Sequence, residues 1–227
     1  MTKNLGIVIY DLVQPMDVFG PWEVFSIWKT ILNAPINMYL VSEFNTPIHA
    51  DSQITLTSHC QFDNAPNFDY LIIPGGKGRI EQSNNQNLLN FIKKQAIECD
   101  YVLSVCTGMF LLYHAGLLKD KAVTTYWRAA PELKALKDVK FCQDRIVKSG
   151  HIWSSGGISS GIDLALALIA EITNPDEAGK VQLLFEYFPE HFTYCNLETK
   201  NELPNYQSNI SAQLTELPQY IKDYINA

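Results

Sequence analysis

The 227-residue sequence has no hydrophobic run long enough to span a bilayer: its longest apolar stretches are residues 5–10, 101–105 and 109–113. Its N-terminus lacks the basic region and long apolar core of a secretory signal. Five cysteines, an odd number at irregular spacing, do not form a disulfide framework. From these absences we expect a soluble, cytoplasmic protein that does not bind membranes.

Basic residues are also scarce and scattered. Lys and Arg number 17 against 24 Asp and Glu, a formal net charge of −7. Phosphate contacts supply most of the affinity of nucleic-acid binders, so we expect no nucleic-acid partner. The five histidines show no metal-ligand spacing, no CxxC pair occurs, and the glycines of residues 75–78 lack the third glycine of a dinucleotide fingerprint. We therefore expect no metal and no cofactor.

Apolar residues, by contrast, are plentiful. They make up 47% of the chain, against 18% charged residues, which is typical of a folded globular domain. Short β-rich runs alternate with stretches at helical spacing, which predicts an α/β fold with a mostly parallel sheet covered on both faces. We expect this domain to occupy residues 1–195. The polar residues 196–227 are interpreted as a C-terminal extension, helical at 217–225, that packs on the domain or on a partner.

Two helix starts carry local signals. Pro21 suits the first turn of a helix over residues 21–31, because its missing N–H costs nothing there. Ser160 and Asp163 form an S-x-x-D capping pattern before a helix over residues 164–172.

The sharpest chemical signal is Cys106, between a buried strand and an apolar helix in Val105-Cys-Thr-Gly108. Ligands of parallel α/β sheets bind at the C-terminal ends of strands. A tight strand-to-helix turn also holds its central residue strained and exposed, and free N–H groups of the following helix favour a thiolate. A cysteine among apolar neighbours is usually a core residue, but this position favours a nucleophile. The other four cysteines are interpreted as structural.

Two further segments are expected at the same edge of the sheet. Asp17 lies in the loop after the first strand, where its carboxyl group could exchange protons with the thiol if burial raises its pKa. Alternatively it caps the turn into the next helix. Gly75 and Gly76 follow another strand, and their N–H groups could bind a developing negative charge as in an oxyanion hole, or simply form a tight turn.

Together these motifs resemble the ThiJ/PfpI superfamily of class I glutamine-amidotransferase-like proteins. The resemblance covers residues 4–190 and implies a flavodoxin-like three-layer α/β sandwich with a nucleophile elbow, in a homodimer. The matching pieces are Asp17-Val-Phe-Gly-Pro21, Asp69-Tyr-Leu-Ile-Ile-Pro-Gly-Gly76, Val105-Cys-Thr-Gly108, Ala122-Val-Thr-Thr-Tyr-Trp127 and Ser154-Ser-Gly-Gly-Ile-Ser-Ser-Gly-Ile-Asp163.

Within the superfamily, the first-loop Asp and the Cys-Thr-Gly elbow most resemble the isonitrile-hydratase-like members. This resemblance implies a lyase that hydrates a small isonitrile to an N-substituted formamide without a cofactor. Cys106 would form a thioimidate, Asp17 would act as acid and base, and Thr107 would assist the thiolate. The backbone of Gly75 and Gly76 would line the anion pocket.

Tyr126, Trp127 and Ile158 are interpreted as pocket walls. Tyr126 stands where isonitrile-hydratase-like sequences commonly carry a histidine, in Thr-Thr-His-Trp. Protease-like members also place a histidine after the elbow cysteine, where this chain has Thr107. Without such a histidine to deprotonate the thiol, peptidase or amidase activity loses its base.

Two alternatives stay open. One is a non-enzymatic or redox-sensing domain in which Cys106 oxidises to a sulfinic acid, as exposed thiols of low pKa do. Relatives precede helix-turn-helix modules in AraC-type regulators, but about thirty residues after the core are too few for such a module. The other is a glyoxalase- or deglycase-like enzyme that uses the same thiol and carboxylate on small dicarbonyls, although those relatives carry a Glu in the first loop.

Overall fold

The centre of the protein is a seven-stranded sheet in the order β10-β11-β7-β6-β1-β2-β5, in a computed structural model that describes residues 2–189. Neighbouring strands are parallel, apart from the antiparallel pair β10–β11. The predicted mostly parallel sheet is therefore confirmed. The strands are β1 (Lys3–Val8), β2 (Ile36–Ser42), β5 (Cys60–Gln61), β6 (Tyr70–Ile73), β7 (Tyr101–Ser104), β10 (Ile146–Ser149) and β11 (Ile152–Ser155).

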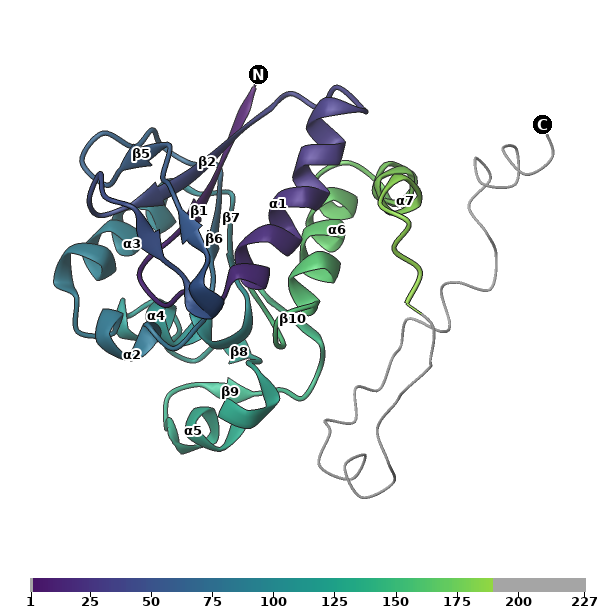
Figure 1. The fold of residues 1–227 in the computed structure, drawn as a ribbon. Coiled ribbons are helices and arrows are strands. Elements are labelled where there is room, and N and C mark those ends of the chain that lie inside the picture. Colours follow the sequence, from purple (N-terminus) through teal and green to yellow (C-terminus); the bar gives the residue numbers. More distant parts are fainter. Residues whose placement is uncertain (1, 190–227) are drawn as a thin grey trace, which may run out of the picture.

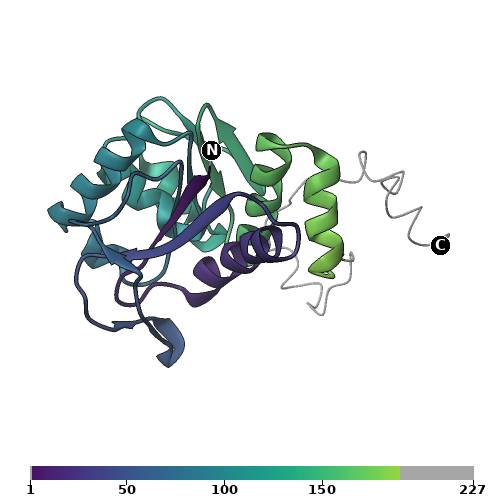
Figure 2. The ribbon, with the colours of Figure 1, turned by 90° about the horizontal axis from the view of Figure 1, so that it is seen from above.

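Helices cover both faces of this sheet, which makes the predicted three-layer sandwich (Figure 1). One face carries α1 (Pro15–Thr30), α6 (Ser160–Ile172) and α7 (Pro175–Leu184). The other carries α2 (Arg79–Gln82), α3 (Gln86–Glu98) and α4 (Met109–His114). Seen from above, the purple and green helices stay apart from the teal ones (Figure 2).

The central strands are apolar because both of their faces are buried. In β6 all four residues are buried, and Leu5, Ile7 and Leu103 of the adjacent strands are inaccessible to solvent. Gly6 interrupts β1 for a steric reason: a Cβ at this position would lie 2.6 Å from the Phe68 ring. This buried sheet thus positions the loops at its ends.

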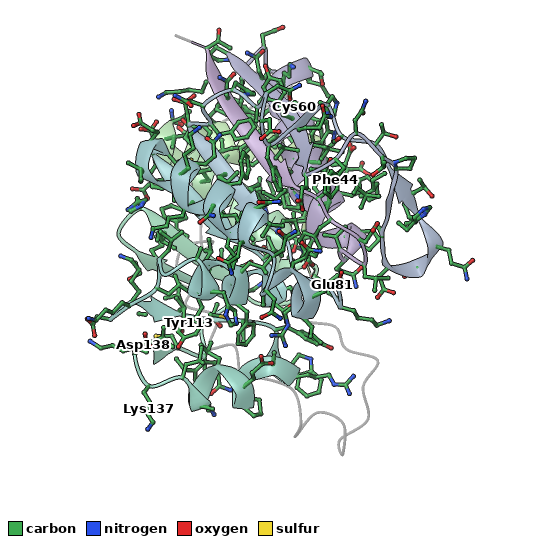
Figure 3. All side chains as sticks on the ribbon, turned by 90° about the vertical axis from the view of Figure 1, so that its left-hand side faces the viewer. Phe44, Cys60, Glu81, Tyr113, Lys137 and Asp138 are labelled. Atoms are coloured by element: carbon green, nitrogen blue, oxygen red, sulfur yellow. The ribbon has the colours of Figure 1, made fainter. Side chains whose placement is uncertain are left out.

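A smaller segment lies below this sheet in Figure 1 and contains β8 (Ala122–Val123), α5 (Ala130–Ala135) and β9 (Lys140–Phe141). The hairpin β3 (Ile48–His49) and β4 (Thr55–Leu56) lies after β2. Arg79 Nη1 on α2 donates to Glu132 Oε1 on α5 at 2.6 Å. Tyr113 on α4 and Asp138 before β9, seen together in Figure 3, form a second contact between the smaller segment and the helices of the sandwich. Their hydrogen bond raises the pKa of the Tyr113 phenol.

The predicted start of the first helix is wrong. Helix α1 begins at Pro15, which provides the proline of the first turn, and contains Pro21 in its interior. The Pro21 ring packs on α6, where a Cβ at Gly161 would lie 3.1 Å from its Cγ. Asp17 consequently lies in the first turn of a helix and not in a loop.

The predicted capping pattern before α6 is also wrong. The helix already begins at Ser160, so Ser160 is its first residue and not its N-cap, and Asp163 lies in its first turn. The Asp163 carboxylate accepts a hydrogen bond from Arg145 Nε at 2.7 Å and so forms an ion pair with this residue.

The predicted C-terminal extension, residues 196–227 with its helix at 217–225, lies outside the described residues. None of the helices within residues 2–189 is long and apolar enough to cross a membrane.

Candidate active site

Cys106 occupies a strained turn directly after β7. Its φ is 58°, a left-handed conformation that is costly for a residue with a side chain. Two hydrogen bonds hold the backbone there: Cys106 N–H donates to the Gly156 carbonyl at 2.8 Å, and the Thr125 hydroxyl donates to the Cys106 carbonyl at 2.9 Å. A Cβ at Gly108 would lie 2.0 Å from the Ile73 carbonyl oxygen, so the elbow requires glycine here.

The Asp17 carboxyl group is completely buried beside this elbow. Its Oδ2 accepts a hydrogen bond from Gly75 N–H at 2.9 Å, whereas Oδ1 has no partner in hydrogen-bond geometry among the described residues. Burial raises the pKa of Asp17 to about 7, and the Gly75 N–H, the Cys106 thiol and the Ile158 N–H only partly oppose this. The expected effect of burial is confirmed, and the alternative role as a helix cap is wrong because this side chain caps no helix N–H.

The Cys106 thiol differs from the expected exposed thiolate. Only 6% of the residue is exposed, and burial raises the pKa of the thiol to about 12, with the Asp17 charge as the second cause. The N–H groups of Thr107 and Ile158 favour the thiolate but contribute less. The prediction failed because burial and a neighbouring carboxylate outweigh the dipole of the short turn and the six-residue α4. The site therefore holds a neutral thiol next to a carboxyl group that titrates near neutral pH.

The two glycine N–H groups do not form the expected anion pocket. Gly75 N–H is bound to Asp17, and Gly76 N–H donates to Thr107 Oγ1 at 3.1 Å. A Cβ at Gly75 would lie 2.5 Å from both the nitrogen and Oγ1 of Thr107, and Gly76 has a φ of 133°. These glycines let the loop touch the elbow, and their N–H groups position Asp17 and Thr107.

The remaining predicted residues lie on two adjoining segments. Ile158 has a φ of 51°, is 37% exposed, and turns its N–H toward Asp17 and Cys106. The Tyr126 ring packs on Gly157, the residue before Ile158, so closely that a Cβ at Gly157 would lie 2.4 Å from the ring. Trp127 meets Tyr126 edge-on, with ring centroids 5.9 Å apart. Their assignment as pocket walls stays a prediction.

Sequence reasoning missed three contributors to the site. The Thr125 hydroxyl and the Gly156 carbonyl hold the elbow backbone, and both lie inside the motifs that carried the family resemblance. Tyr10 is the third: its hydroxyl donates to the Pro74 carbonyl at 2.7 Å. Only its place at the end of the first apolar run could have pointed to it.

None of the other cysteines within residues 2–189 shares this setting. Cys60 and Cys99 are buried and Cys142 is half-buried, while Cys195 lies outside the described residues. Burial raises the pKa of Cys99 to about 12. Within the part of the chain that the structure describes, no three His, Cys, Asp or Glu side chains gather as ligands for a metal ion.

Comparisons with known proteins agree with the fold and identify a family. The model of the DJ-1/PfpI family matches residues 3–171. Isonitrile hydratase from Pseudomonas putida is 34% identical over 189 residues, which cover 83% of this chain and 80% of that protein. A crystal structure of a ThiJ/PfpI family protein from Pseudomonas syringae has a TM-score of 0.80 at 23% identity, covering 94% of this chain and 86% of the other. DJ-1beta from Drosophila melanogaster has a TM-score of 0.74 at 15% identity, covering 83% and 100%.

Proposed function

This chain belongs to the DJ-1/PfpI family, and on that basis we propose that it is a cofactor-independent isonitrile hydratase. The observation that carries the proposal is the pair of Asp17 and Cys106. A buried carboxyl group with a pKa of about 7, one oxygen of which has no partner in hydrogen-bond geometry within residues 2–189, interacts with a thiol whose raised pKa leaves it almost entirely neutral at pH 7. The identity with Pseudomonas putida isonitrile hydratase supports the choice of substrate.

The first chemical step adds the thiol across the terminal carbon of the isonitrile. Asp17, as the carboxylate, takes the thiol proton, and the sulfur of Cys106 bonds to that carbon. The carbon, which carries a lone pair in the free isonitrile, receives the proton from Asp17. The N≡C bond becomes N=C, and the product is the thioimidate R–N=CH–S attached to Cys106.

The second step hydrolyses this thioimidate. Asp17 takes a proton from a water molecule whose oxygen attacks the same carbon, and the nitrogen receives that proton. The tetrahedral intermediate R–NH–CH(OH)–S then collapses: its hydroxyl proton passes through Asp17 to the departing sulfur. The products are the N-substituted formamide and the thiol of Cys106, with no change in oxidation of the protein.

The pKa values suit this cycle. A thiol with a pKa of about 12 is ionised in only about one molecule in 10⁵ at pH 7, so the attack depends on a base that removes the proton as the carbon–sulfur bond forms. A carboxyl group with a pKa of about 7 is present in both forms near neutral pH and can take and return protons. No histidine is needed, which fits Tyr126 and Thr107 at the two positions that carry histidine in other members.

The test is turnover of a panel of small isonitriles, with the formamide detected by proton NMR. We expect wild-type protein and the Cys99→Ala control to consume isonitrile, and Cys106→Ala to lose all turnover. Unchanged turnover in Cys106→Ala, or no turnover in wild-type protein, would reject the proposal. Loss of methylglyoxal in the same panel without loss of isonitrile would support the dicarbonyl alternative.

The redox-sensing alternative makes a different demand on the thiol. It needs an ionised, accessible sulfur, whereas burial and Asp17 raise the pKa of Cys106. Mass spectrometry after mild peroxide tests it, with preferential oxidation of Cys106 as the supporting result. We also propose a homodimer, which light scattering coupled to gel filtration would test.

A further inference from the structure

One peptide group in the site is hydrogen-bonded on both sides. The Tyr10 hydroxyl donates to the carbonyl of Pro74 at 2.7 Å, and the N–H of Gly75 donates to Asp17 Oδ2 at 2.9 Å. That carbonyl and that N–H belong to the same peptide group. The phenol, the peptide and the carboxylate therefore form one continuous chain of hydrogen bonds.

Such a chain transmits polarisation. An O–H donated to an amide oxygen draws electron density toward that oxygen and makes the N–H of the same amide a stronger donor. A stronger donor favours the carboxylate over the carboxylic acid. Tyr10 is only 4% exposed and Asp17 is fully buried, so solvent screens this effect little.

The loop that holds this peptide is fixed from both sides. Gln14, the residue before α1, donates its N–H to the Gly75 carbonyl at 2.9 Å. Gly75 in turn donates its own N–H to Asp17 in the first turn of α1. A Cβ at Gly78 would lie 1.9 Å from the Asp11 carbonyl oxygen, which shows how closely the segment after β1 lies on this loop. The Tyr10 hydroxyl thus acts on a peptide with little freedom to turn away.

Few ionisable groups face Asp17. Cys106 faces it from the elbow and Tyr10 from the end of β1, and Arg79 on α2 acts on Tyr10. From the segment before α6 comes only the Ile158 N–H, and the α6 carboxylate Asp163 is paired with Arg145. Burial raises the pKa of the Tyr10 phenol well above its usual value, so it stays a neutral donor.

We propose that Tyr10 is a positioning residue for Asp17: by donating to Pro74, it holds and polarises the peptide whose N–H binds the carboxylate. Its catalytic consequence rests on the proposed hydratase activity, because Asp17 is the acid and base of that reaction. The same hydrogen bond also satisfies a buried carbonyl, and the test has to separate the two effects.

The experiment follows the carboxyl carbon of Asp17 by ¹³C NMR as pH is varied, with the resonance assigned by its loss in Asp17→Asn. In Tyr10→Phe we expect the pKa of Asp17 to rise by about 0.2 to 0.6 unit, since one polarising bond is lost. Tyr70→Phe is the matched control: Tyr70 is equally buried, but it lies at the N-terminal end of β6, away from the site. The control should leave the titration of Asp17 unchanged.

A second variant gives the opposite sign without removing the hydroxyl. Site-specific 3-fluorotyrosine at position 10 is a more acidic phenol and a stronger donor, so it should lower the pKa of Asp17. An unchanged pKa in both variants, with only a lower melting temperature in Tyr10→Phe, would overturn the proposal. If Tyr10→Phe does not fold, the fluorotyrosine titration decides alone.

This titration needs no substrate, so it separates the two proposals. A shift in pKa in protein that turns over no isonitrile would sustain the role of Tyr10 and reject the hydratase. In an active hydratase, the acidic limb of kcat/KM should move by the same amount as the pKa of Asp17. If the protein is active but neither substitution changes the acidic limb of the kcat/KM pH profile or the titration of Asp17, the hydratase proposal stands and the role of Tyr10 is rejected.

Discussion

Carboxyl groups lie in opposite environments at the two ends of the same central strands. At the N-terminal ends of β1, β6 and β7, Lys3 Nζ donates to Asp69 at 2.7 Å and to Asp100 at 2.8 Å, and these side chains are partly exposed. At the C-terminal ends, Asp17 is fully buried, forms no ion pair within residues 2–189, and binds a single backbone N–H in hydrogen-bond geometry.

The difference separates a stabilising cluster from a reactive one. Hydrogen bonds to Asp100 and Asp69 raise the pKa of Lys3, which means that folding favours the charged form of this lysine. Burial raises the pKa of Asp17, which means that folding disfavours its charge. A carboxyl group exchanges protons near pH 7 only if its anionic form is destabilised. The capacity of Asp17 for proton transfer therefore lowers the stability of the fold.

The largest effect expected from this contrast is on activity. Asp17→Asn keeps the shape of the side chain but removes the base, so we expect isonitrile turnover to fall by about 10³-fold. Asp100→Asn, at the opposite edge, should leave turnover within about twofold of wild type. Initial rates at pH 7 measure both. Similar losses in the two variants would mean that Asp17 acts through stability and not through proton transfer.

The next effect is on stability as pH changes. The pKa of Asp17 rises from about 4 in the unfolded chain to about 7 in the folded protein, so the folded state binds more protons between these values. Stability should therefore fall as pH rises from 4 through 7, by roughly 3 to 4 kcal/mol from this group, and level off about one pH unit above 7. Urea unfolding of wild type and Asp17→Asn at several pH values measures this. The variant should lack this fall, and parallel curves would contradict the prediction.

Much of this edge could be predicted from the sequence. The alternation of apolar runs located β7 and hence Cys106, and the Cys-Thr-Gly pattern indicated a strained elbow. These features are local: a strand, a turn and a glycine with no room for a side chain follow one another in the chain. The family resemblance rested on the same local motifs, and it was confirmed.

The state of the two reactive groups could not be predicted in the same way. Pro15 and Pro21 both fit a helix start. In the structure Pro15 occupies the first turn and Pro21 packs against α6, so Asp17 lies in a buried first turn. The pKa of Cys106 depends on that placement, because burial and the Asp17 charge set it. The partners of the Gly75 and Gly76 N–H groups, Asp17 and Thr107, likewise come from distant parts of the chain, so the local sequence predicts an anion pocket in their place.

A smaller effect tests how tightly the reactive edge is packed. Gly75→Ala would place a Cβ 2.5 Å from Thr107, so the loop or the elbow must move. We expect a loss of about 2 kcal/mol in stability, together with reduced turnover. Gly150→Ala is the control: its φ of 66° is strained for alanine, but nothing lies within 4 Å of its Cβ. It should cost about 1 kcal/mol and leave turnover unchanged, and equal turnover in both variants would show that the loop does not position the site.

The smallest effect is expected at the ion-paired edge. Lys3→Met removes both salt bridges, but the Lys3 side chain is 41% exposed, so solvent and salt already weaken them. We expect a loss of about 1 kcal/mol or less near pH 7, with unchanged turnover.

Because the pKa of Lys3 is raised by folding, this contribution is complete below pH 10 and disappears as pH rises through the folded-state value. Urea unfolding with and without 1 M NaCl checks it: salt should reduce the difference between variant and wild type, since screening acts on exposed pairs. If the difference in unfolding free energy does not change with salt, the aliphatic part of Lys3, and not its charge, stabilises this edge.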